Sequence, residues 1–286
     1  MNGLDSRAAR ALPLIGIVFA AVALILSTST PAYGRPGPPT PPTRLPLGVS
    51  PSRQGSPTTT IGWSVEERPL VVHRFGTGPS KRMIVAGIHG GYEWNTTELA
   101  YQLIEFLERN ADVVPQNVTL YVLPLVNPDG AARSQGYEGR ANSNGVDLNR
   151  NFPHQWQHEW PTGGCWSYLP IHGGDHPFSE PESKALARFI LAEHVEALIS
   201  YHSAALGIFS GGRPEHPGST RLAEAVAGVT EYPYPPLDTG CEYTGQLTDW
   251  AAANGISAVD VELTTHYSID FEQNLRVLFT FLYFQP

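Results

Sequence analysis

The fold is decided by residues 82–110, which read RMIVAGIHGGYEWNTTELAYQLIEFLERN. The first part, 82–88, is a short run rich in apolar and β-branched residues, and it predicts a strand. The last part, 96–110, carries apolar side chains at helical spacing on one face, with a threonine available as cap, so it predicts a helix. A strand that leads through a short loop into a helix is typical of an α/β fold.

The same alternation of strands and helices continues from residue 61 to the C-terminus. Further strands are predicted at 70–75, 118–123, 196–201 and 256–263. Further helices are predicted at 179–194, 221–229, 245–254 and 270–284. Between them, residues 127–178 are rich in Gly, Asn, Pro and His and have little periodicity, which is typical of a functional loop region. We therefore predict a single α/β domain with a mixed, mainly parallel β-sheet and helices on both faces.

The N-terminus has a different character from the rest of the chain. Two arginines precede the apolar run 11–26, and small and polar residues follow it, so residues 1–34 are predicted to be a signal peptide. An uncleaved signal anchor is the alternative. Residues 35–58 are dense in Pro, Thr and Ser and predict a disordered linker, which leaves 59–286 as the folded domain. Both interpretations of the first segment place the domain outside the cytoplasm, secreted or membrane-anchored.

The charge balance of the domain bears on its partners. From residue 59 onward there are 13 basic and 26 acidic residues, a difference of −13. Such an acidic surface argues against a nucleic-acid partner. The chain has two cysteines, Cys165 and Cys241, which can form one disulfide in an oxidising compartment or remain two separate thiols.

Three residues that can serve metal chemistry fall at the ends of predicted strands. His89 follows the strand 82–88, His202 follows the strand 196–201, and Glu262 lies near the end of the last strand. The carboxyl ends of strands meet at one edge of an open α/β sheet, so these segments can gather there. Two histidines, a carboxylate and a water make the open ligand set of a hydrolytic zinc site. A second carboxylate that does not bind the metal can then transfer protons.

The sequence around these positions resembles a known family. The motifs are, in order, Ile88–Glu93, Asn127–Gly130, Gly145–Pro153, Ser179–Glu182, Ser200–Ser203, Gly245–Trp250 and Val261–Leu263. The series resembles the zinc metallocarboxypeptidases, particularly the compact bacterial branch that includes murein-peptide carboxypeptidases. The resemblance runs from about Ile61 to the C-terminus and implies that family's α/β fold.

The resemblance also implies a metal site and a base. His89, Glu93 and His202 would hold one Zn²⁺ ion, and Glu262 would act as general base and acid. The family usually places its first Glu three residues after the His, whereas Glu93 stands four residues after His89. Gly90 and Gly91 can absorb the extra residue, because glycine tolerates conformations closed to others. Glu98 is the alternative ligand, although it falls inside the following helix.

Three further positions are assigned to the substrate by the same resemblance. Asn149 and Arg150 would bind the free carboxylate of the substrate's last residue, which a planar guanidinium can grip with two parallel hydrogen bonds. Arg140 would stabilise the carbonyl oxygen in the transition state, with Arg133 as the weaker candidate.

Two substrate-contacting positions depart from the family pattern. The family's mobile tyrosine has no clean match, because the count from Gly245 falls on Cys241, and Tyr243 two residues further on is the substitute. A Cys165–Cys241 disulfide would pin this loop. Thr248 would line the floor of the specificity pocket, where it is small and polar.

Several functions are compatible with these residues. The first is an exopeptidase that removes C-terminal residues from peptides, and the second is a peptidase that cuts the γ-D-glutamyl bond to diaminopimelate in peptidoglycan stems. A binding protein that has lost catalysis is a third interpretation, which the intact ligands and base oppose. An N-acyl amino acid deacylase is a fourth, which the signal segment opposes. The expected partner is thus a peptide or a cell-wall stem peptide, and a monomer is the default state.

Overall fold

A computed structural model describes residues 55–161, 166, 168–204, 207–238 and 240–286. These residues belong to one compact unit, Pro51–Pro286. The predicted signal segment 1–34 and most of the predicted linker 35–58 lie outside the described residues. Within the described part of the chain, no helix combines the length and the apolar character needed to cross a membrane.

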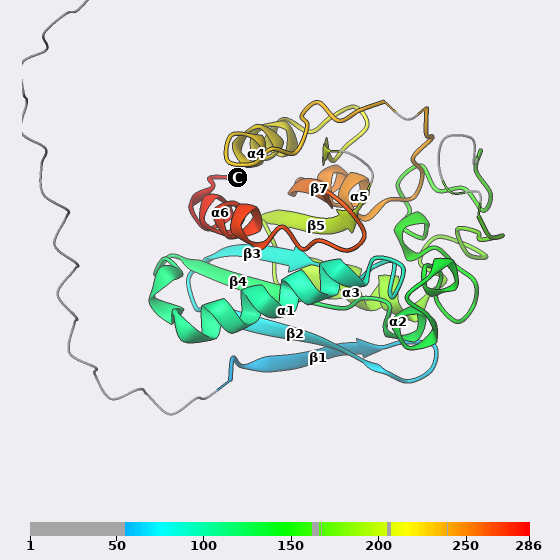
Figure 1. Cartoon of the computed structure of the whole chain (residues 1–286), viewed down its shortest axis with the longest axis horizontal. Coiled ribbons are helices and arrows are strands. Elements are labelled where there is room, and N and C mark those ends of the chain that lie inside the picture. The colour runs from blue at the N-terminus through cyan, green and yellow to red at the C-terminus, as the bar shows by residue number, and fades with distance from the viewer. Residues whose placement is uncertain (1–54, 162–165, 167, 205–206, 239) are drawn as a thin grey trace, which may run out of the picture. The chain divides into compact units, whose positions relative to one another are not determined.

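The centre of the domain is a seven-stranded sheet with the order β1-β2-β4-β3-β5-β7-β6 (Figure 1). Its strands are β1 Thr58–Trp63, β2 Pro69–Gly76, β3 Ser80–Val85, β4 Val118–Leu123, β5 Ala197–Ser203, β6 Ile208–Ser210 and β7 Ser257–Leu263. The neighbours β4, β3, β5 and β7 pair in parallel, whereas β1, β2 and β6 join by antiparallel pairing. The predicted mixed sheet is therefore confirmed, with its parallel part in the middle.

Helices cover both faces of the sheet, as the alternating side chains of the strands require. One face packs against α1 (Trp94–Arg109), α4 (Pro217–Ala227) and α6 (Phe271–Tyr283), and the other against α3 (Pro181–Ala192) and α5 (Leu247–Ala253). In β3, Ile84 belongs to the first core, whereas Met83 and Val85 belong to the second. The parallel strands are thus apolar on both faces, which explains their continuous apolar sequence.

Some elements differ from the sequence-based expectation. The strand predicted at 118–123 coincides with β4, but β3 ends at Val85, so a three-residue segment separates it from His89. β5 continues through Ser203 and includes His202 as a strand residue. The edge strands β1 and β6 and the short helix α2 (Pro128–Arg133) were not predicted, because short or exposed elements carry little periodic signal.

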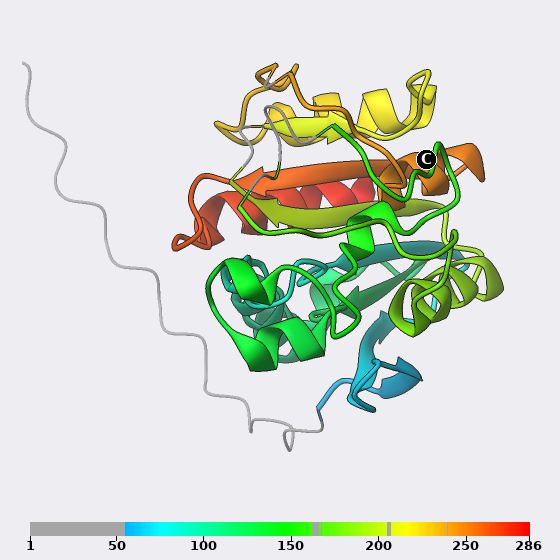
Figure 2. The same ribbon diagram turned by 90° about the vertical axis from the view of Figure 1, so that its right-hand side faces the viewer.

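The carboxyl ends of the parallel strands are covered by the long loop region. Figure 2 shows the green segment that follows β4 passing in front of the sheet, whose central strands cross the picture with their arrowheads at the left. The segment contains α2 and two short 3₁₀ turns, Tyr137–Gly139 and Leu148–Arg150. Residues predicted to act on substrate are therefore brought over the edge where the strands end.

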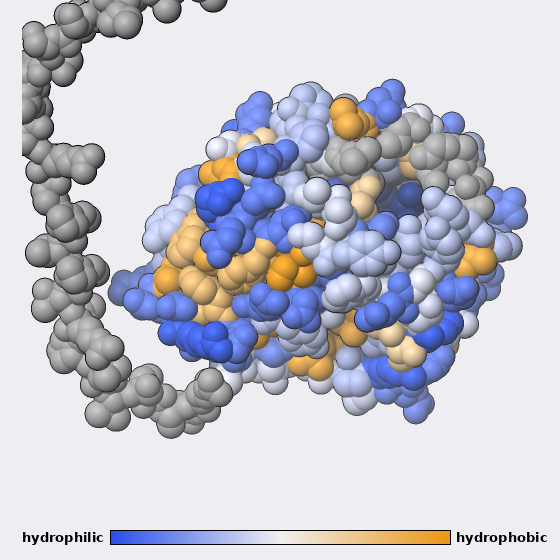
Figure 3. Space-filling view, viewed as in Figure 1, coloured by the Kyte–Doolittle hydropathy of each residue, from blue (hydrophilic) through white to orange (hydrophobic). Residues whose placement is uncertain are grey.

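Exposed apolar side chains gather on a different part of the surface from this loop region (Figure 3). In the space-filling view (Figure 3) they lie over α6 and the adjoining part of α1, where the rings of Phe106 and Phe279 meet edge to face with centroids 6.0 Å apart. Neither ring lines the cavities described below.

Candidate metal centre and substrate cavity

The loop between β3 and α1 has a shape that depends on two glycines. Gly90 has a φ of +49°, in the left-handed region. At Gly91, a Cβ atom would lie 1.9 Å from the carbonyl oxygen of Ser134, so no other residue fits there. This tight loop brings His89 and Glu93 together, with 2.7 Å between His89 Nδ1 and Glu93 Oε1. The loop at Gly90 and Gly91 thus accommodates the four-residue spacing between His89 and Glu93, as the sequence predicted.

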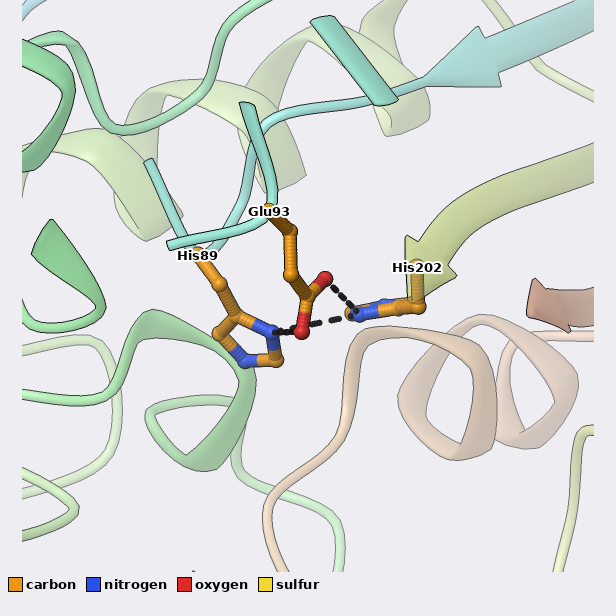
Figure 4. A group of neighbouring side chains, drawn as sticks. All are labelled: His89, Glu93 and His202. Carbon is orange, nitrogen blue, oxygen red and sulfur yellow. Dashed lines mark hydrogen bonds and ion pairs between the residues drawn. The ribbon is translucent and has the colours of Figure 1, made fainter. Parts of the chain in front are cut away.

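His202 approaches the same carboxylate from β5 (Figure 4). Its Nδ1 lies 3.1 Å from Glu93 Oε2 and 3.3 Å from His89 Nδ1. Among the described residues, these three are the group that could hold a metal ion, and all are buried. Two nitrogens that bind one tetrahedral zinc at about 2.0–2.1 Å stand about 3.3–3.4 Å apart. The observed separation of the two Nδ1 atoms matches that value, so the cluster fits zinc.

Asp147 holds the far side of the His89 ring. Its Oδ1 lies 3.1 Å from His89 Nε2, which leaves Nδ1 directed at the metal position. Its other oxygen accepts from Arg140, whose Nε and Nη2 lie at 3.0 and 2.9 Å. A carboxylate that accepts the second ring proton of a ligand histidine fixes the tautomer and the ring orientation.

The His202 ring is supported by its neighbours in the sheet. Its Nε2 lies 3.0 Å from Ser200 Oγ, 3.3 Å from Asn149 Nδ2 and 3.4 Å from Asp260 Oδ1. In the parallel pairing of β5 with β7, Ser200 stands beside Asp260 and His202 beside Glu262. Because residues two apart share a face of a strand, these four side chains project from the same side of the sheet.

The charges of the cluster favour a cation at its centre. Burial alone would raise the pKa of Glu93, but the adjacent His89 and His202 rings outweigh it and lower that pKa. Burial likewise opposes a charge on His202, yet the carboxylates of Glu93 and Asp260 raise its pKa well above the ordinary value. The carboxylates that would attract a proton to this site attract a divalent cation in the same way.

Glu262 is placed beside the metal ligands without belonging to their cluster. It is buried on β7, pairs in register with His202, and lines the same cavity as the three ligands. The register fixes its distance from His202 at the spacing of neighbouring strands, about 4.8 Å between backbones. The sheet thus brings Glu262 into the cavity that the metal ligands line.

The cavity has a volume of about 300 Å³ and includes the residues predicted to contact substrate, Arg140, Asn149, Arg150 and Tyr243. Arg150 is buried, with Nη1 bonded to the Asn149 carbonyl at 2.9 Å and Nε without a hydrogen-bond partner among the described residues. Its guanidinium lies 5.2 Å from the Trp160 ring and 5.9 Å from the Tyr243 ring. A buried guanidinium with a spare donor suits an incoming carboxylate.

The remaining predicted positions lie apart from the metal. Glu98 is exposed on α1, and Arg133 is exposed and donates to the carbonyls of Glu138 and Ala141. Neither of the two lines the cavity. Thr248 is buried and lines a second, adjoining cavity, where its hydroxyl donates to Asp260 Oδ2 at 2.8 Å.

Sequence reasoning missed several members of the site. Asp147 lies inside the motif that carries Asn149, and Asp260 stands two residues before Glu262 on one strand, so period-2 spacing could have found it. An aromatic wall beside Arg140 had no sequence signal: the guanidinium lies 4.7 Å from the Trp166 ring, which contacts Tyr92 edge-on at 4.8 Å.

Cys241 also lines the cavity and is disulfide-bonded. The sequence holds one other cysteine, Cys165, which lies outside the described residues.

Known proteins with similar sequences are peptidases and amidases. The gamma-D-glutamyl-L-diamino acid endopeptidase 1 of Lysinibacillus sphaericus is 27% identical over 237 residues, covering 70% of this chain and 57% of its own. Murein peptide amidase A of Escherichia coli K12 is 30% identical over 186 residues, covering 63% of this chain and 69% of its own. The human carboxypeptidase N catalytic chain is 34% identical over 172 residues, covering 51% of this chain and 37% of its own.

Solved structures show the same fold. The murein-tripeptide amidase of Escherichia coli O157 superposes with a TM-score of 0.59 at 28% identity, covering 82% of this chain and 95% of that one. Bovine thrombin-activatable fibrinolysis inhibitor, at 23% identity, has a TM-score of 0.63 and covers 80% of this chain and 89% of its own.

The family model described as zinc carboxypeptidase matches residues 54–274, most of the chain and nearly all of its folded domain. The match spans both the His89–Glu93 loop and Glu262. The chain therefore belongs to the zinc carboxypeptidase family and is a zinc-dependent metallopeptidase.

Proposed function

We propose that this protein is an exported carboxypeptidase that hydrolyses the last peptide bond of its substrate. In this proposal His89, Glu93 and His202 hold zinc, and Glu262 transfers protons. Asn149 and Arg150 bind the terminal carboxylate of the substrate.

The proposed reaction uses each of these residues for one task. Zinc, when bound, lowers the pKa of a bound water to about 7 and polarises the substrate carbonyl. Glu262 accepts the proton of the attacking water and delivers it to the leaving amine. Arg140 donates to the carbonyl oxygen as negative charge develops on it, and Asp147 holds the guanidinium in place for that donation.

The exopeptidase proposal rests on the burial and the hydrogen bonding of the Arg150 side chain. Its side chain is buried, its Nε has no hydrogen-bond partner among the described residues, and it lines the same cavity as the metal cluster. A buried donor without a partner costs free energy, so such a group is expected to meet a partner when the substrate binds. A free C-terminal carboxylate supplies a charged partner that can accept two hydrogen bonds from the guanidinium, whereas an internal peptide bond offers one neutral carbonyl oxygen.

The test compares peptides that differ only at the C-terminus, as free acid or as amide. We expect the wild-type protein to cleave the free acid at least about 100-fold faster in kcat/KM, since charge-assisted hydrogen bonds contribute about 1.5–3 kcal/mol each. In Arg150→Gln the difference should largely disappear. Arg133→Gln is the matched control and should retain it. Equal cleavage of acid and amide by the wild-type protein would contradict the proposal.

A second candidate is hydrolysis of peptidoglycan stem peptides at the γ-D-glutamyl bond to a diamino acid. Two of the similar proteins carry names for that class of substrate. The second cavity also contains both Arg213 and carboxylates, which suits a side chain bearing both charges. Mass analysis after incubation with muropeptides tests it, and free diaminopimelate without trimming of ordinary peptides would favour it over the first candidate.

We also propose that residues 1–34 direct export. The support is the sequence pattern of basic residues, an apolar run and small residues. Fractionation of expressing bacteria followed by N-terminal sequencing of the mature protein tests this. Protein found only in the cytoplasm with an intact N-terminus would contradict it.

A further inference from the structure

A second cavity, of about 280 Å³, adjoins the cavity that holds the metal cluster. The two share the lining residues Phe209, Cys241, Tyr243, Gln246 and Asp260. The metal ligands line the first cavity and not the second. The second cavity is therefore a side pocket of the reaction cavity, open to a group that extends away from the bond to be cut.

The walls of this side pocket carry an excess of negative charge. Its charged lining residues are Arg213, Glu215, Asp238, Asp249 and Asp260, which is one cation against four carboxylates. Asp249 is already paired, since it accepts from Gly212 N at 2.8 Å and from Arg213 Nε at 3.0 Å. This pair offsets the charge of Arg213 and leaves the rest of the pocket acidic.

Asp260 is the buried member that keeps a spare oxygen. Its side chain is 6% exposed, and its Oδ2 accepts from Thr248 at 2.8 Å. Its Oδ1 is buried and forms no hydrogen bond among the described residues. Its cationic neighbour there is the His202 ring, whose Nε2 lies 3.4 Å from Oδ1 and 3.0 Å from Ser200 Oγ. A buried carboxylate oxygen without a donor is costly, and a cationic donor entering the pocket would satisfy it.

We propose that the side pocket receives the side chain of the substrate's last residue and that Asp260 selects an ammonium group at the end of that side chain. This inference rests on the proposed carboxypeptidase function, since it assigns the substrate class of the same site. Asp260 replaces Thr248 as the residue that decides specificity, and Thr248 acts by holding the carboxylate in place.

Two kinds of substrate carry the required ammonium group. One is an ordinary peptide that ends in lysine, and the other is a stem peptide that ends in a diamino diacid. The diamino diacid adds a carboxylate, which Arg213 can contact because its side chain is 44% exposed at this pocket. The shared chemistry is the side-chain ammonium, and Arg213 should matter only for the diamino diacid.

The experiment uses two matched pairs of substrates with the full-length zinc protein. One pair ends in lysine or norleucine, and the other ends in diaminopimelate or 2-aminopimelate, so the members of each pair differ by one ammonium group. We expect kcat/KM to favour the ammonium member of at least one pair by about 10- to 100-fold, the range for a hydrogen bond to a charged group. In Asp260→Asn the ratio should fall to about 1 on the same reasoning.

The ratio of the two kcat/KM values of a substrate pair, measured with the same variant, separates loss of selectivity from damage to the metal site. Asp260→Asn can also disturb His202, but such an effect lowers both members of a pair equally, and zinc content is measured alongside. Thr248→Val removes the hydrogen bond that positions Asp260 and keeps the charge of Asp260, so it should lower the preference less than Asp260→Asn does. Arg213→Gln should lower cleavage of the diaminopimelate substrate relative to the lysine substrate.

Two results would overturn the inference while leaving the proposed function intact. The first is release of norleucine and 2-aminopimelate at least as fast as their ammonium partners by the wild-type protein. The second is a preference that survives in Asp260→Asn. If the protein releases no C-terminal residue from any substrate, the proposed function fails, and this inference fails with it.

Discussion

Replacing Asp147 with asparagine tests how far the metal site depends on a residue that does not bind the metal. Asp147 is fully buried and accepts hydrogen bonds from His89 Nε2, from the Arg140 guanidinium and from the backbone N of Asn149. Burial alone would raise its pKa, but Arg140 and His89 hold that pKa well below the ordinary value, so Asp147 is ionised at neutral pH. The asparagine keeps the size of the side chain and removes its charge.

Two losses follow from that change. Without the charge of Asp147, the nearest carboxylate oxygen to Arg140 is Glu93 Oε1, 3.5 Å from Nη1. The buried positive charge of Arg140 is then poorly compensated. Removing one partner of a buried ion pair typically costs about 3–5 kcal/mol of stability. The His89 ring loses its charged acceptor, because asparagine has one neutral amide oxygen in place of two carboxylate oxygens. Losing such a partner typically weakens metal binding about 10- to 100-fold.

The assay measures zinc affinity by competition with a chelator and stability by urea unfolding of the metal-free and zinc-bound protein. Asp129→Asn is the matched control, because Asp129 is also buried and accepts from Ser64 and Arg68, outside the metal cluster. The control should lose stability and keep its zinc affinity. Unchanged zinc affinity in Asp147→Asn, or an equal loss in the control, would refute the role assigned to Asp147.

Three further predictions concern separate parts of the molecule. Glu262→Gln should retain zinc and lose about 10²- to 10⁴-fold in kcat, the usual contribution of a proton-transferring group, and loss of zinc from the variant would show that Glu262 is a ligand. Glu182 is fully buried, and its burial raises its pKa from 4.5 to about 7. Its protonated form therefore stabilises the fold below about pH 4.5, and that contribution is lost as the pH rises through about 7. Glu182→Gln should accordingly be near neutral in urea unfolding at pH 4.5 and more stable than wild type by roughly 3 kcal/mol at pH 8, whereas destabilisation at pH 8 would contradict it. Finally, intact mass after thiol alkylation should show modified cysteines only when a reductant is added, because Cys241 is disulfide-bonded.

The sequence was sufficient for the parts of the fold that rest on strong periodicity. The continuous apolar run of a buried strand such as β4 predicts a strand, and the apolar face of an amphipathic helix such as α1 predicts a helix. β6, with three residues, cannot establish a period. The end of β3 was placed too late because Ala86 and Ile88 continue the apolar pattern after the strand's pairing has ended.

The residues of the candidate site also divide into those that could be predicted from the sequence and those that could not. His89, Glu93 and His202 could be located because each has ligand chemistry and a specific local motif. The period-2 spacing from Glu262 puts Asp260 on the same face of β7. Its contact with Thr248 and with the side pocket, however, depends on how β7 packs against α5, two segments that the sequence does not relate. Packing between segments that are distant in the chain produces no spacing pattern in the sequence from which it could be predicted.

The register of β5 and β7 has a consequence for how the sequence of the protein can evolve. His202 and the proposed base Glu262 sit on adjacent hydrogen-bonded strands, so their separation is set by the sheet. The side pocket is bounded largely by connecting segments, including Arg213, Leu237 and Asp238. Insertions and substitutions in those segments can alter which residue is accepted while the bond-breaking apparatus keeps its dimensions. The connecting segments can thus evolve without moving the metal ligands, whereas Asp260, 3.4 Å from His202 on the rigid sheet, couples the side pocket to the metal site.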